Sequence, residues 1–433
     1  MKKTLVALAA LAVAGVASAQ SSVTLFGIAD VSYTNLNANG AGSVGLLTGS
    51  GRNASSRLGF RGTEDLGGGL AASFWLEMGL NIDSGAGAAT TTNATTLGDR
   101  VLVGGTLPAG NALNGTQGLT FNRRSTLSLS GTWGEIRLGR DYTPTFWNMT
   151  VNDPYGTVGV GSATVVTYGS LNPFGGGSNG TQVRTSNSIQ YLGKVGDFYG
   201  QVMVGLSEMP STCVAVSAAC PGVDGDGELF SGRIGYGSGP FDISFAYSQT
   251  KFSDTAANAA TTPTNAIAVG GVVNAGSNTN PFRGTYSVAH LAGSYNAGFA
   301  KFWAQIGTEE VDQPSTGSSN AQGGKLTHYM IAATVPFGAT EFKAAYHWGE
   351  YNRNGIGVPA AGAWEEGSTT KHLALGFVYN FSKRTAVYGT IATIDTTGLN
   401  TRASLIGLNS VAATTVGGSN NSTGIDLGLR HAF

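Results

Sequence analysis

The feature that most constrains this chain is a repeated segment of about ten residues in which large apolar residues alternate with small or polar ones. In the segment FDISFAYS, for example, Phe241, Ile243 and Phe245 occupy alternate positions, and the residues between them are small or polar. Successive side chains of a β-strand point to opposite faces, and about ten residues is the length of a tilted strand that crosses a membrane. The pattern therefore predicts an all-β chain whose strands have one apolar and one polar face. It recurs in residues 328–337, 372–381 and 423–433.

The connections between these segments alternate between short and long. The short ones are residues 64–69, 131–134, 193–197, 237–240, 297–298, 338–339 and 382–383, and the long ones include residues 83–120, 252–284 and 352–370. Short turns on one rim and long loops on the other are typical of a transmembrane antiparallel β-barrel. Seven turns join seven strand pairs and leave one strand at each end, which predicts about sixteen strands. A barrel of that size encloses a water-filled lumen. A soluble propeller or sandwich would instead have even loop lengths and polar outward faces.

The composition fits such a barrel. The chain has 67 glycines and only 11% charged residues, whereas ordinary globular chains have about 7% glycine and about 25% charged residues. The absence of a second long apolar run excludes a helical membrane protein. The content of 15 tyrosines, 19 phenylalanines and 6 tryptophans disfavours disorder.

The first residues are typical of a secretory signal peptide. The chain starts MKK, continues through an apolar stretch at residues 5–16 and reaches ASA at residues 17–19. That stretch is shorter than the roughly 20 residues of a membrane-spanning helix, so an anchor is the weaker interpretation. We expect a signal peptide at residues 1–19 and a barrel at residues 20–433. Cleavage removes two of the 24 basic residues and leaves 22 against 25 acidic ones, which does not indicate nucleic acid as a partner.

The two cysteines, Cys213 and Cys220, lie close together in a loop-like segment. In an exported chain this spacing favours a disulfide within the loop. Zinc would need further ligands, and no histidine lies nearby, so we expect neither a metal nor a cofactor. The chain contains no nucleophile elbow, zinc-binding helix motif or phosphate-binding loop, and we therefore expect no enzymatic activity.

Three segments and the last residue resemble the Gram-negative general diffusion porins, most closely the β-proteobacterial type. They are SVTLFG at residues 22–27, SRLGFRGTEDLGGG at residues 56–69, RLGRDY at residues 137–142 and the terminal Phe433. The resemblance implies a sixteen-stranded homotrimer in the bacterial outer membrane, in contact with membrane lipid and lipopolysaccharide. It also implies that Phe433 serves as an assembly signal. In that family a long third loop folds into each lumen and narrows it. The corresponding loop is residues 142–181, in which Asp153 is the one acid, with Asp141 at its entry.

Strand alternation predicts the direction of several arginines. Arg57 and Arg61 lie opposite Leu58 and Phe60, and an arginine on the lipid side of a barrel costs roughly 2 to 4 kcal/mol at mid-bilayer. Both arginines should therefore point into the lumen. The same parity turns Arg124, Arg137 and Arg184 inward, and the resemblance places Arg57, Arg61 and Arg184 in a basic ladder across the pore from the third loop. The expected pore constriction consists of Arg57, Arg61, Arg124, Arg137, Arg184, Glu77, Asp141 and Asp153. An alternative is that these arginines merely solvate a polar wall.

We therefore expect a passive channel for small hydrophilic solutes and inorganic ions that prefers anions. A substrate-specific anion channel is the alternative, with the same arginines forming a saturable site. A barrel that serves as an adhesin or scaffold is a third possibility. Gly27 and Ala29 present small side chains outward, which hints at a subunit interface beside the first strand.

Overall fold

The computed structural model describes residues 22–38, 42–88, 120–167, 183–206, 228–254, 282–312, 323–354, 367–397 and 421–433. The expected signal peptide and both cysteines lie outside these ranges. Within them, no helix combines the length and the apolar character needed to cross a membrane.

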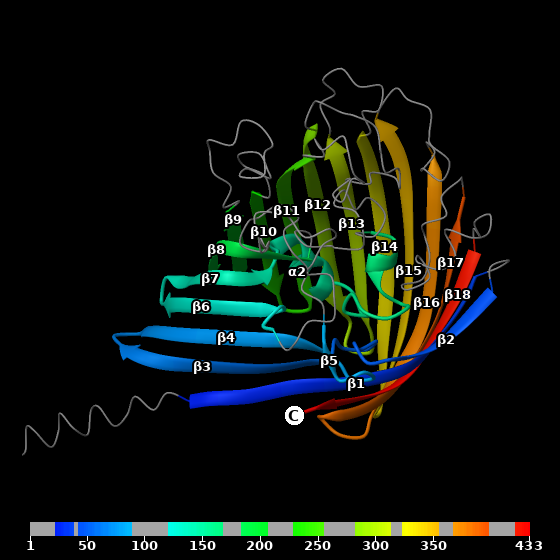
Figure 1. Ribbon diagram of the computed structural model, residues 1–433, viewed down its shortest axis with the longest axis horizontal. Helices are drawn as coiled ribbons and strands as arrows, with labels where there is room; N and C mark the ends of the chain where they lie inside the picture. The colour runs from blue at the N-terminus through cyan, green and yellow to red at the C-terminus, as the bar shows by residue number, and fades with distance from the viewer. Residues whose placement is uncertain are drawn as a thin grey trace, which may run out of the picture.

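The strands of the described ranges form one closed antiparallel sheet (Figure 1). Its wall strands are β1 (Ser22–Ala38), β3 (Arg57–Gly67), β4 (Leu70–Asn81), β6 (Arg124–Gly131), β7 (Gly134–Tyr142), β8 (Arg184–Val195), β9 (Phe198–Gly205), β10 (Leu229–Ser238), β11 (Phe241–Asp254), β12 (Phe282–Asn296), β13 (Lys301–Asp312), β14 (Gly323–Phe337), β15 (Thr340–Asn354), β16 (Ser368–Asn380), β17 (Thr385–Thr396) and β18 (Asn421–Ala432). Each pairs with its neighbours along the chain, and β1 closes the sheet by pairing with β18 from Ile28↔Ala432 to Ala38↔Ser422. The prediction of about sixteen strands is confirmed.

Two short strands add to this wall. β2 (Gly42–Thr48) pairs with the second half of β1, whose first half pairs with β3, so β2 and β3 share one place in the barrel. β5 (Ala86–Gly87) pairs with the end of β4. Between β2 and β3 the chain turns toward the inside, where the backbone amides of Asn53 and Ala54 donate to the Asp30 carboxylate at 3.1 and 2.7 Å.

All seven expected short turns connect neighbouring strands. The turn between β14 and β15 contains Gly338, whose φ of 60° is in the left-handed region that favours glycine. The position of each turn fixes the register, and a shift of one residue would exchange the two faces of a strand.

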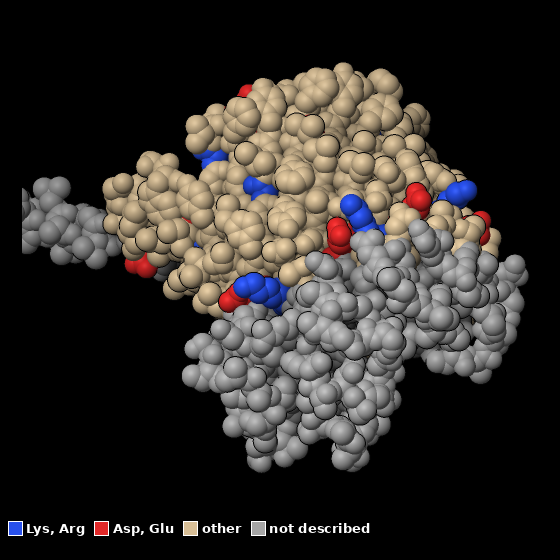
Figure 2. All heavy atoms as spheres, turned by 90° about the horizontal axis from the view of Figure 1, so that it is seen from above, with Lys and Arg blue, Asp and Glu red and all other residues tan. Residues whose placement is uncertain are grey.

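The two faces of the wall differ as the alternation predicts. Leu127, Ile243 and Leu427 are 62%, 52% and 59% exposed on the outside, whereas Thr126, Ser244 and Asp426 are buried on the inside. The described surface in Figure 2 is largely free of charged side chains. This outer face suits lipid, and the inner face suits water.

Gly27 lies on the outer side of β1, directly under the last residue of the chain. Its backbone exchanges two hydrogen bonds of 3.1 Å with Phe433. A Cβ atom on Gly27 would lie 2.3 Å from the Phe433 ring, so only glycine leaves room for this ring. The small size of Gly27 therefore has an explanation within one chain and does not by itself indicate a subunit interface.

The connection after β7, which the sequence predicts as the long third loop, contains regular structure. It forms α2 (Pro144–Val151), capped by the Thr143 hydroxyl, and a 3-10 helix, η2 (Ala163–Val165). We call residues 143–167 the internal segment. In Figure 1 α2 lies on the concave side of the sheet. α2 contacts β9, β10, β11 and β12, and the rest of the segment reaches β15, β16 and β18.

Two apolar clusters hold the internal segment against the inner wall. In the first, α2 residues Phe146 and Met149 pack with Tyr286, Leu326 and Met330 of the wall. In the second, Tyr155, Val160 and Val165 pack with wall residues that include Ala345, Ala374 and Ile394. Burial of these side chains favours the docked position by about 25 cal/mol for each Å² of apolar surface removed from water.

Candidate functional site

Glu77 on β4 is the centre of a charged group on the inner wall. Its Oε1 atom lies 2.6 Å from Arg123 Nε and 3.8 Å from Arg57 Nη1. Its Oε2 atom accepts a hydrogen bond of 3.1 Å from the Trp75 indole. Antiparallel pairing brings these residues together. Glu77 lies opposite Gly59 on β3, two residues from Arg57, and opposite Arg124 on β6, next to Arg123.

A second carboxylate, Asp141 on β7, binds two of the expected arginines. Arg137 Nη1 lies 2.6 Å from Asp141 Oδ2, and Arg124 Nε lies 3.5 Å from the same oxygen. Arg137 also pairs with Glu135 at 2.9 Å. The inward direction predicted for Arg124 and Arg137 therefore agrees with their contacts.

Tyr142, at the end of β7, joins two further arginines. Its hydroxyl oxygen accepts hydrogen bonds from Arg123 at 2.9 Å and from Arg184 at 2.7 Å. The Arg184 guanidinium also lies 4.3 Å from the centre of the Tyr142 ring. Arg123 was not predicted from the sequence, because it precedes β6 and strand parity does not apply to it. The consecutive pair Arg123-Arg124 was the available signal.

Aromatic rings complete this part of the wall. The Arg61 guanidinium lies 5.3 Å from the Phe26 ring and 5.1 Å from the Trp75 ring, and the Arg124 guanidinium lies 4.5 Å from the Trp75 ring. These distances are in the range of cation–π contacts. Phe26, Trp75 and Arg124 line a recess of about 430 Å³, together with Arg57, Tyr142 and Trp147 of α2.

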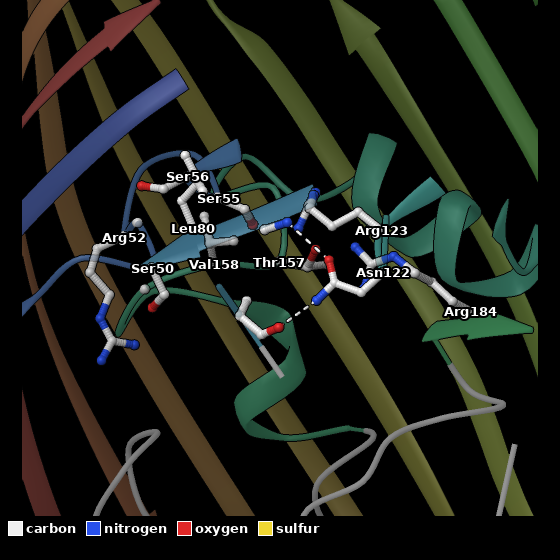
Figure 3. Close-up of a pocket in the computed structure, with 14 residues that line it drawn as sticks. Ser50, Arg52, Ser55, Ser56, Leu80, Asn122, Arg123, Thr157, Val158 and Arg184 are labelled. Carbon is white, nitrogen blue, oxygen red and sulfur yellow. Dashed lines mark hydrogen bonds between the residues drawn. The ribbon is translucent and has the colours of Figure 1, made fainter. Parts of the chain in front are cut away.

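A second recess of about 250 Å³ connects the charged group with the internal segment (Figure 3). Arg123 and Arg184 line one part of it, and Thr157 and Val158 of the internal segment line another. Asn122 fixes the wall here, because its side chain accepts from Gly79 N at 2.9 Å and donates to Ala88 O at 2.7 Å.

The balance of charge in this group is positive. We call its members the arginine cluster. It consists of Arg57, Arg61, Arg123, Arg124, Arg137 and Arg184, with the carboxylates Glu77, Glu135 and Asp141. Six cations face three anions, and both recesses open onto this wall, where a dissolved ion would meet a net positive field.

Asp153 has a different environment from the other expected site residues. Its carboxylate is buried and accepts from the backbone amides of Tyr155, Thr157 and Ala163 at 2.8, 3.0 and 2.9 Å. Burial raises the pKa of the Asp153 carboxyl, and these hydrogen bonds oppose that change. The geometry gives Asp153 a role in the shape of the internal segment, and its contribution to the constriction stays a prediction.

Cations on the opposite wall hold the internal segment. Arg233 on β10 donates to the Asn148 side chain at 2.8 Å and to the Tyr199 hydroxyl at 3.1 Å. Lys343 on β15 donates to the Pro154 carbonyl oxygen at 2.9 Å. Parity gives the inward direction of both residues, but their partners depend on where the segment lies.

A closed sixteen-stranded barrel with an apolar exterior and a charged inner wall defines a channel of the bacterial outer membrane. Residues 4–399 match the family model described as Gram-negative porin, and the chain belongs to this family. It is a porin of the outer membrane.

Three similar proteins match nearly the whole length of the chain. The chain is 34% identical to outer membrane porin protein 32 of Delftia acidovorans, over all of both chains. It superposes on a solved structure, an anion-selective porin from Comamonas acidovorans, with a TM-score of 0.68 and 29% identity, covering 96% of this chain and 100% of the other. The trimer form of OmpT from Vibrio cholerae shares the fold, with a TM-score of 0.59 and 16% identity over 95% of this chain and 99% of the other.

Proposed function

We propose that this porin passes small hydrophilic solutes and inorganic ions with a preference for anions, and that the arginine cluster sets this preference. The observation that carries the proposal is the ratio of six arginines to three carboxylates on one part of the inner wall. Carboxylates on outer loops are screened beyond about 8 to 10 Å, whereas charges that line a pore act on every ion that passes. The similar porin from Comamonas acidovorans, described as anion-selective, supports the same sign.

The internal segment would narrow the lumen opposite this cluster. Two features support this role: its contacts with β9 to β12, and the recess that Thr157 and Val158 share with Arg123 and Arg184. Size would then limit which solutes pass, and the field of the arginines would sort ions by sign.

Reversal potentials in a potassium chloride gradient test the anion preference. Wild-type channels should show it, and Arg57→Gln combined with Arg184→Gln should reduce it. Arg384→Gln is the matched control, because Arg384 is exposed in the short turn between β16 and β17 and its replacement should leave the reversal potential unchanged. A wild type that prefers cations would refute the proposal, as would a preference that survives loss of both cluster arginines.

A substrate-specific anion channel is a second candidate, favoured by the aromatic lining of the larger recess. Phe26, Trp75 and Trp147 there lie beside arginines, an arrangement that suits a carboxylate attached to an apolar body. Liposome swelling with graded sugars and organic anions separates the two candidates. A rate that depends on size alone supports the general porin, whereas saturation by one anion supports the specific channel.

The assembly and the processing of the chain are part of the proposal. A homotrimer embedded in outer-membrane lipid and lipopolysaccharide is expected, with a mature chain that begins at Gln20. Migration on gels before and after boiling, together with light scattering, tests the trimer. The intact mass of the exported protein tests the cleavage site.

A further inference from the structure

Four of the five histidines of the chain converge on the inner wall, although the sequence places them up to 82 residues apart. They are His290 on β12, His328 on β14, His347 on β15 and His372 on β16, and each is at most 2% exposed. The ring centres of His290 and His328 are 5.6 Å apart, and those of His347 and His372 are 5.0 Å apart. We call these four residues the histidine belt.

The belt lies between the wall and the internal segment. His290 Nδ1 is 3.1 Å from Asn148 Nδ2 of α2, and His372 Nε2 is 2.8 Å from the carbonyl oxygen of Val160. Between these two contacts the internal segment also lies close to the wall, because a Cβ atom added to Gly349 of β15 would be only 2.9 Å from the Val166 side chain. The histidines are therefore covered by the segment that the two apolar clusters hold in place.

The hydrogen bonds of the His347–His372 pair require neutral rings. His372 donates from Nε2 to the Val160 carbonyl, so in its neutral form Nδ1 is an acceptor. His347 Nδ1, 2.9 Å away, must then be the donor. A proton on His372 would place two N–H groups against each other. A proton on His347 would add an N–H at its Nε2, which is buried without a partner among the described residues.

His290 is constrained in the same way. The Asn148 oxygen accepts from Arg233 Nε at 2.8 Å and from Ser244 Oγ at 2.6 Å, which turns the Asn148 amide nitrogen toward His290 Nδ1. The opposite ring nitrogen, Nε2, is 3.0 Å from Gln305 Oε1. His290 therefore accepts at Nδ1 and donates at Nε2, and a second proton would oppose the Asn148 amide.

The charged groups around the belt do not compensate a histidinium. Arg233 and Lys343 have the same sign as the added proton. Asp153 is occupied by backbone amides, Glu309 accepts from Tyr286, and Asp426 accepts from Thr34 and from Val160 N. Across the described ranges, no carboxylate oxygen lies within ion-pair distance of a belt histidine. A buried charge without a partner is unfavourable, so protonation favours separation of the segment from the wall.

We propose that the histidine belt is an acid-sensitive latch, which holds the internal segment against the wall while its histidines are neutral and releases the segment into the lumen when they bind protons. The channel then closes as the pH falls below the ordinary titration range of histidine, about 6.5. For each proton that release requires, the ratio of closed to open channels rises by up to about tenfold when the pH falls by one unit. This inference needs only that the barrel conducts, and not that it prefers anions.

Single-channel recording from pH 7.5 to pH 4 in symmetric potassium chloride tests the latch. Wild-type channels should close increasingly at acid pH. The double variant His347→Asn with His372→Gln should lose most of this response, and His290→Gln is a second variant should the pair fail to assemble. His431→Gln is the matched control, because His431 is exposed on the outside near the end of β18. A response of wild-type size in both belt variants would overturn the proposal.

A reversible cross-link tests whether the segment is the part that moves. Thr145 Oγ1 of α2 lies 3.2 Å from Ser248 Oγ of β11, and each oxygen is bonded to Cβ as a cysteine sulfur is, so cysteines at both positions, with Cys213 and Cys220 replaced by serine, should form a disulfide. The oxidised channel should stay open at acid pH, and addition of dithiothreitol should restore closure. Closure that persists with the disulfide intact would refute release of the segment as its cause.

Discussion

Replacement of Glu77 with glutamine should increase the anion preference of the channel. Glu77 is the carboxylate that Arg57 and Arg123 share, and it is only 6% exposed. Glutamine has nearly the same shape and retains one oxygen, which can accept from Trp75 or from Arg123 but not from both, so the substitution removes a negative charge and one hydrogen bond with little change in packing. Arg123 retains its hydrogen bond to the Tyr142 hydroxyl, which keeps its guanidinium in place.

The magnitude follows from Coulomb's law. One charge about 7 Å from a passing ion changes the energy of that ion by about 0.6 kcal/mol in water. The change has opposite sign for chloride and potassium, and salt at 0.1 M with a Debye length of about 10 Å reduces it to about half. The ratio of anion to cation permeability should therefore rise about two- to threefold at 0.1 M salt. At 1 M, where the Debye length is about 3 Å, the effect should nearly vanish.

The assay is the reversal potential at low and high salt, measured for Glu77→Gln and Arg57→Gln in parallel. The two variants should shift it in opposite directions by similar amounts, and both shifts should shrink at high salt. Unchanged heat-modified migration on gels serves as the control for folding. Shifts in the same direction, or a Glu77→Gln channel with a weaker anion preference, would refute the assignment of selectivity to this cluster.

Three further predictions concern the fold. Gly27→Val should destabilise the barrel by about 1 to 3 kcal/mol through overpacking against the Phe433 ring. The variant should recover its heat-modified gel mobility more slowly during refolding, and recovery at the wild-type rate would contradict that contact. Asp153→Ala removes three backbone hydrogen bonds within the internal segment, so conductance should become noisier while the melting temperature of the barrel stays unchanged; quiet currents would argue against this role. Cys213 and Cys220 should be joined in the exported protein, and their replacement by serine should barely change barrel melting. Two free thiols in mass spectrometry would disprove the pairing.

The sequence predicted the wall of this protein well because the signals for a barrel are local. A period of two assigns each strand residue to one face, and a short turn fixes the register of the pair that it joins. The outward direction of Leu127 and the inward direction of Arg124 follow from their positions alone. The strand count follows from the number of short turns, since β2 and β5 add no place in the wall.

The arginine cluster could be predicted in part. Parity turned Arg57, Arg124 and Arg137 inward, but it could not choose their partners. Glu77 binds Arg123 because β4 lies beside β6 in one register and the residue before β6 folds back toward it. Such a contact depends on side-chain reach across strands, which the pattern of a single strand does not contain.

Closure of the barrel and docking of the internal segment were decided only in the tertiary structure. Closure pairs β1, the first strand, with β18, the last one, and thereby places Gly27 under Phe433. The segment after β7 packs against apolar residues far along the chain, and there it covers His290 and His372. In the sequence these histidines are isolated residues of separate strands. They form one belt because strand pairing places His347 opposite His372, and His290 and His328 on either side of Gly307. The register between strands joined by long loops is not encoded in the local sequence.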